Sequence, residues 1–79
     1  MNIESILSEF EASMGLVLDN LKQEKVGERY LLFKDQLKKT IFNIIDKHNL
    51  DLQNPDKSQA FLDQLRPNIE AYLERLYTL

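Results

Sequence analysis

Few side chains in this sequence could carry chemistry, and the most suggestive lie close to its one histidine. Asp46 precedes His48 by two residues, and Asp51 follows it by three. An imidazole and carboxylates can share a metal ion, but a di-iron site in a helical bundle needs Glu-x-x-His motifs on two helices, and residue 45 is isoleucine. We therefore predict no metal and no cofactor, and we interpret His48 as a structural residue at the end of a helix.

Glu70 and Glu74 are a well-spaced pair of carboxylates, because residues four apart share one face of a helix. An acid/base pair also needs a pocket that separates the two pKa values, and nothing in the sequence indicates one. The sequence also contains no glycine-rich phosphate loop and no serine nucleophile motif. We predict no catalytic residues and expect that the protein is not an enzyme.

The charged residues are unevenly distributed along the chain. Residues 1–21 carry four acids and no base, whereas the bases of the middle segment project at different angles from a helix and form no stripe. These bases are Arg29, Lys34, Lys38, Lys39 and Lys47. The whole chain has a net charge of −3, and nucleic acid requires a concentrated basic surface. We predict no nucleic-acid partner and note an acidic face on the first segment.

The spacing of apolar residues predicts that the first segment is a helix. Its apolar positions alternate spacings of four and three, which is the pattern of helix-on-helix packing. They are Ile3, Leu7, Phe10, Met14, Val17 and Leu21, flanked by Ile6 and Leu18. Gly27 is placed to end the helix in a left-handed conformation. We therefore predict a first helix over about residues 3–25.

A broader apolar stripe predicts a second helix, from near Glu28 to about His48, as the centre of the fold. The stripe comprises Tyr30, Phe33, Leu37, Ile41, Ile44 and His48, widened by Ile45, Leu31 and Phe42. An arc this wide suits a helix that touches two neighbours. Lys34 is the exception, since it projects toward the apolar arc and must lay its stem on apolar surface.

The last segment predicts a third helix that contains a proline. Asn54 is a suitable N-cap and Pro55 suits the first helical position. The apolar residues of this segment stay on one side of a helix and keep their phase across Pro67; they are Phe61, Leu65, Ile69, Tyr72, Leu73 and Leu76. Pro67 removes one backbone hydrogen bond, so the helix is either kinked or split there into two. The predicted fold is all-α: a small antiparallel up-down-up three-helix bundle that forms one domain over residues 1–79. No apolar run is long enough to span a membrane, and the acidic N-terminus lacks the basic region of a signal peptide, so we expect a cytoplasmic protein.

Surplus apolar residues favour a role in protein–protein interaction. Leu16, Leu32, Leu50, Leu52 and Leu79 lie off the stripes, and Tyr30, Tyr72 and Tyr77 are amphipathic. Our interface candidates are Leu16, Leu32, Leu50, Tyr72 and Tyr77. Because Leu32 projects about 160° from the middle of its stripe, we expect it outside the core, at the contact of a homodimer.

Three functional hypotheses follow from the sequence. The leading one is a non-enzymatic helical interaction module that self-associates and has a protein partner. The first alternative is a small acidic antagonist or immunity-type protein that neutralises a basic partner through the acidic first helix. The second alternative is a helical bundle that binds a ligand or a metal ion.

Overall fold

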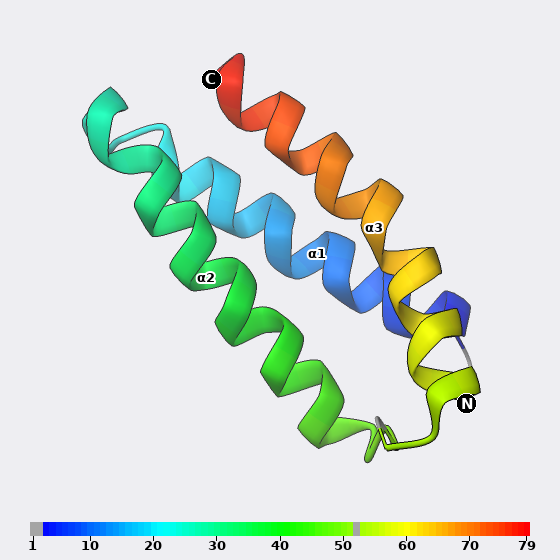
Figure 1. Cartoon of the computed structure of the whole chain (residues 1–79). Coiled ribbons are helices and arrows are strands. Elements are labelled where there is room, and N and C mark those ends of the chain that lie inside the picture. The colour runs from blue at the N-terminus through cyan, green and yellow to red at the C-terminus, as the bar shows by residue number, and fades with distance from the viewer. Residues whose placement is uncertain (1–2, 52) are drawn as a thin grey trace.

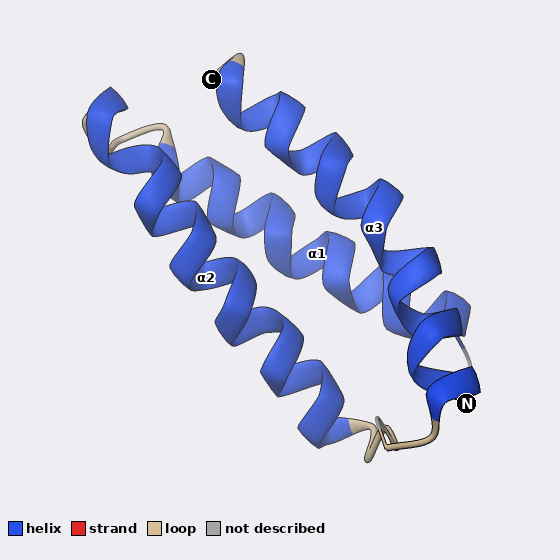
Figure 2. Cartoon of the chain, in the orientation of Figure 1, coloured by secondary structure: helices blue, strands red, loops and turns tan. Residues whose placement is uncertain are grey.

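The computed structural model describes residues 3–51 and 53–79 and shows three helices. They are α1 (Ile3–Leu21), α2 (Val26–Lys47) and α3 (Pro55–Tyr77). Consecutive helices run in opposite directions (Figure 1), and the described residues contain no strand (Figure 2). The predicted all-α, up-down-up three-helix bundle is therefore confirmed. None of the described helices is both long and apolar enough to cross a membrane.

The core is organised around α1, which packs against both other helices and lies between them in Figure 1. Its whole inner face is buried and comprises Ile6, Phe10, Met14, Leu18 and Leu21. Leu7 and Val17, which we expected inside the seam, are only partly buried. The α1 helix is thus turned slightly from the predicted seam, because it must face α2 on one side and α3 on the other.

The prediction that the second helix is central is wrong. Only Phe33 and Ile44 of α2 are buried, and both Leu31 and Phe42 are 67% exposed. Direct contact between α2 and α3 is sparse in comparison with the contacts that each makes to α1. A broad apolar arc permits several rotations of a helix, and packing against α1 selects the one that centres Phe33 and Ile44.

The turn between α1 and α2 differs from the prediction and depends on Arg29. Helix α1 ends at Leu21, and Gly27 lies in the first turn of α2 without a positive φ, so Gly27 does not terminate α1. Instead the Arg29 guanidinium donates to the carbonyls of Leu21 (Nε, 2.9 Å) and Lys22 (Nη2, 3.0 Å). It also donates to the Leu79 carbonyl (Nη1, 3.3 Å). A cation here satisfies carbonyls at the end of a helix and complements the helix dipole.

Helix α3 continues through Pro67 as one helix, so the split into two helices is wrong. The Asn54 side chain caps its start by accepting from the backbone N–H groups of Asp56 and Lys57, at 3.1 and 3.4 Å. Phe61 and Leu65 are buried before the proline, and Tyr72 and Leu76 are buried after it. The apolar stripe keeps its phase across Pro67, and packing along that stripe holds the helix together where one hydrogen bond is missing.

Candidate functional site

The polar residues around His48 form a tie between two helices. His48 Nε2 lies 2.8 Å from one carboxylate oxygen of Glu9, and Lys47 Nζ donates to the other at 2.8 Å. Glu9 belongs to the first half of α1, whereas Lys47 and His48 lie at the end of α2. The antiparallel arrangement brings these ends together, and the side chain of Glu9 becomes 31% exposed.

The electrostatics of this tie are those of an ion pair. The hydrogen bond from Lys47, followed by the one from His48, lowers the pKa of the Glu9 carboxyl below its usual value of 4.5. His48 is therefore paired with Glu9 and not with Asp46 or Asp51. Across the described residues, no three side chains of the metal-ligating types lie close enough together to hold an ion. The tie links α1 to the end of α2 and can stabilise the bundle.

The five interface candidates have very different surroundings. Leu16 is 66% exposed and Tyr77 is 72% exposed. Leu50 is partly buried and packs against the core. Tyr72 is buried: its hydroxyl donates to the Glu11 carbonyl of α1 at 3.0 Å, and its ring meets Phe10 edge-on with centroids 6.0 Å apart. The fifth candidate, Leu32, is also partly buried; Leu52, a surplus apolar residue that was not a candidate, lies outside the described residues. Only Leu16 and Tyr77 are thus freely accessible.

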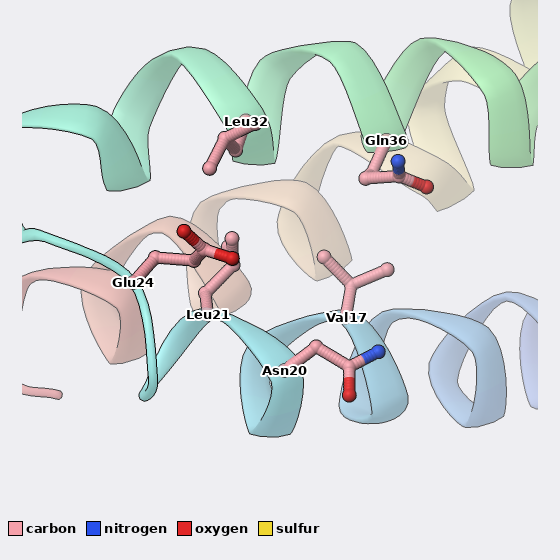
Figure 3. Close-up of a pocket in the computed structure, with 6 residues that line it drawn as sticks. All are labelled: Val17, Asn20, Leu21, Glu24, Leu32 and Gln36. Carbon is pink, nitrogen blue, oxygen red and sulfur yellow. The ribbon is translucent and has the colours of Figure 1, made fainter.

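Leu32 packs against the core, so the expectation that it points away from the core is wrong. Figure 3 shows its side chain directed toward α1, above Leu21 and Val17. These residues, with Asn20, Glu24 and Gln36, line a shallow hollow of about 220 Å³ between α1 and α2. The rotation of α2 that buries Phe33 also brings Leu32 toward α1. A dimer contact through Leu32 stays a prediction, but its premise is lost.

A more extensive apolar surface lies between α2 and α3. One hollow of about 260 Å³ is lined by Tyr30, Phe33, Lys34 and Leu37 of α2 and by Ile69 and Leu73 of α3. Ile69 also lines a second hollow of about 320 Å³, with Leu62, Leu65, Arg66 and Glu70. Tyr30 also lines a third, of about 160 Å³, with Val26, Arg29, Leu76, Tyr77 and Leu79. The three hollows share lining residues, and we call them together the α2/α3 groove.

The α2/α3 groove has an apolar floor and a polar rim. Leu37, Ile69 and Leu73 are only partly buried in it, while Tyr30 and Leu62 are about half exposed, at 49% and 48%. Lys34 is exposed at its α2 edge, where its stem can cover apolar surface. Such a concave apolar surface with charged edges is typical of a site that accepts a helix.

Of the five interface candidates, Tyr77 lines the α2/α3 groove, where it lies near Tyr30. Sequence reasoning missed Leu62, Ile69 and Leu73 as site residues, because the first was unassigned and the other two belong to a stripe that suggested core. The sequence signal was Lys34, since a lysine directed toward an apolar arc indicates that the arc is not closed there.

No protein-family model matches the chain, and no curated protein or solved structure is significantly similar to it. Its function must therefore be argued from the α2/α3 groove and the charges around it.

Proposed function

We propose that this chain is a non-enzymatic helical protein–protein interaction module, which acts in the cytoplasm, self-associates, and binds an apolar helix face in the α2/α3 groove. The observation that carries the proposal is the chain of three connected hollows along α2 and α3. Helix-in-groove recognition places side chains of the i, i+3, i+4 and i+7 positions into such hollows.

The size of the exposed surface supports this proposal. A folded monomer of 9.3 kDa is expected to expose roughly 5,000 Å². This chain exposes 5631 Å². The sparse contact between α2 and α3 is in keeping with this excess, since Leu37, Ile69 and Leu73, which lie between them, are only partly buried. An added helix would cover them and supply a further hydrophobic layer.

The two alternative functions have less support. Among the four acids of α1, Glu9 is paired with Lys47 and His48, and Asp19 lies 3.6 Å from Lys22. This internal pairing weakens the acidic face that an antagonist of a basic partner would present. The hollows measure about 160 to 320 Å³, at or below the low end of the roughly 300–1,000 Å³ of small-molecule sites.

Site-specific photo-crosslinking tests the proposed function. A photoreactive phenylalanine analogue at Leu62, on the groove, is expected to yield covalent protein adducts in cells. The same analogue at Leu16, which is 66% exposed on α1, is the matched control and is expected to yield few. Both positions are exposed, so both variants keep the fold.

The pattern of adducts decides the outcome. Strong adducts from position 62 and weak adducts from position 16 support recognition through the α2/α3 groove. Equal yields from both positions, or no adducts from position 62, would contradict it.

A further inference from the structure

We propose that the occupant of the α2/α3 groove is a second copy of this chain, bound through a two-fold axis that runs parallel to the groove. In this arrangement α2 of each copy lies on α3 of the other. The inference rests on the proposed function, because it names the partner of that same groove. It also replaces Leu32 by the groove as the surface of self-association.

The two edges of the groove carry opposite charges. On α2, Lys34 lines the groove and Lys38 follows one turn later on the same face. On α3, Glu70 lines the groove, and Glu74 follows one turn later. Arg66 is a base on the α3 edge, which nonetheless keeps a net negative charge. All four of Lys34, Lys38, Glu70 and Glu74 are exposed, and the ion pairs found in the described part of the chain do not include them.

A two-fold axis along the groove brings the unlike edges together. Rotation about such an axis exchanges the two edges but leaves the height of each residue along the groove unchanged. Lys34 shares a hollow with Ile69 and Leu73, so it lies at the height of Glu70 to Glu74. Lys34 of one copy therefore meets Glu70 and Glu74 of the second copy. The reverse contact forms at the same time, because a two-fold contact is self-complementary. Because α2 and α3 are antiparallel, Lys38 lies one turn further on, at the height of Arg66, and is not counted among these contacts.

The same two-fold rotation also packs the apolar residues of the two grooves against each other. Helix directions are preserved by the axis, so α2 of one copy runs antiparallel to α3 of the other, as it does to α3 of its own chain. The result is a four-helix antiparallel layer with Leu37, Ile69 and Leu73 inside it. Tyr30, Leu62 and Tyr77, exposed by 49%, 48% and 72%, lie along the same groove and gain cover. An interface of standard size buries about 800 Å² per partner.

Charge reversal with complementation tests this arrangement directly. The native protein is expected to have a mass near twice the 9.3 kDa of one chain, by light scattering behind a sizing column. The variant Lys34→Glu should dissociate, as should Glu70→Lys/Glu74→Lys, each with a dissociation constant raised roughly 100-fold, since each reverses the four contacts that Lys34 makes with Glu70 and Glu74 across the two-fold axis. An equimolar mixture of the two variants should regain the dimer.

The matched control has the same change in net charge away from the groove. Lys39→Glu alters an exposed lysine of α2 that points away from Lys34. This variant should remain a dimer. Circular dichroism should show that all three variants are helical, because every substituted side chain is exposed.

Each other outcome overturns the inference. A native protein that stays at 9.3 kDa at its highest soluble concentration excludes the second copy. A dimer that resists both charge reversals has its contact elsewhere, and a mixture that stays monomeric excludes the reciprocal two-fold contact. If the native protein is monomeric while position 62 crosslinks to a different protein, the inference fails together with the self-association in the proposed function, and recognition of another protein through the α2/α3 groove stands. If position 62 crosslinks to nothing, both fail.

Discussion

Helices α1 and α2 are similar in length and both amphipathic, yet they contribute very differently to the core. α1 has 19 residues and buries five of its side chains, whereas α2 has 22 residues and buries two. The single phenylalanine of α1, Phe10, is 0% exposed, whereas α2 has one buried phenylalanine, Phe33 at 2%, and one outside the core, Phe42 at 67%. The difference lies in the width of the apolar stripe and not in the amount of apolar surface.

A narrow stripe fixes the rotation of a helix, and a broad one does not. On α1, polar residues flank the apolar positions, so almost any other rotation would bury a charge. On α2, apolar residues extend around more than half of the helix, and several rotations bury a similar area. The neighbours decide which is adopted, and the residues left outside, together with the α2/α3 groove, become available for contacts.

The largest expected effect comes from truncating one phenylalanine on each helix. Phe10→Ala should lower the free energy of unfolding by about 3–5 kcal/mol, since it leaves a cavity in the core. The whole free energy of unfolding of a 79-residue domain is only about 4–12 kcal/mol. Phe42→Ala should change it by no more than about 0.5 kcal/mol. Urea unfolding followed by circular dichroism measures both changes. Similar losses would contradict the conclusion that α1 and α2 contribute differently to the core.

A smaller effect is expected from the hydroxyl that joins α3 to α1. Tyr72→Phe removes the hydrogen bond to the Glu11 carbonyl and should cost about 0.5–1.5 kcal/mol. Burial, and then the charge of Glu11, raises the pKa of Tyr72, so the hydroxyl stays protonated and donates at neutral pH. Tyr30→Phe on α2 is the control, because that side chain is half exposed. Equal melting temperatures for native protein and Tyr72→Phe would show that this bond contributes nothing.

The smallest effect concerns the ion pairs that Glu9 makes with the end of α2. Folding lowers the pKa of Glu9, so its contribution is present above pH 4.5 and is lost as the pH falls through the folded value. Glu9→Gln should melt slightly below the native protein at pH 7, and the gap should close in acid. Asp35→Asn, which breaks an exposed pair with Lys39 within α2, is the control. A gap that persists unchanged at pH 3 would mean that charge is not its cause.

The fold could be predicted because its determinants are local. Spacings of three and four residues indicate helices, Asn54 and Pro55 mark the start of α3, and a constant phase across Pro67 favours one helix. The end of α1 was misplaced because Gly27 is a local signal for a cap, while the cap is supplied by Arg29 from eight residues beyond Leu21. Such a contact depends on how the next helix returns, which local spacing does not specify.

The candidate site could be predicted only in part. Tyr77 was an interface candidate and Lys34 was identified as a charge beside apolar surface, and both line the α2/α3 groove. Leu32 was misplaced because the middle of a broad stripe is poorly defined, and a rotation of α2 brings it to α1. Leu62 and Glu9 acquire their roles only through residues on other helices, so no pattern within their own segments could indicate them.

The central position of α1 has a consequence for the motions of the chain. Because α2 and α3 are each attached mainly to α1 and little to each other, either can detach without dragging the other along. Amide hydrogens of α1 should therefore exchange with solvent only when the whole domain opens, and those of α3 should also exchange through a partial opening that leaves α1 and α2 paired. The molecule thus has one central helix, α1, and two outer helices, each of which can separate from α1 independently.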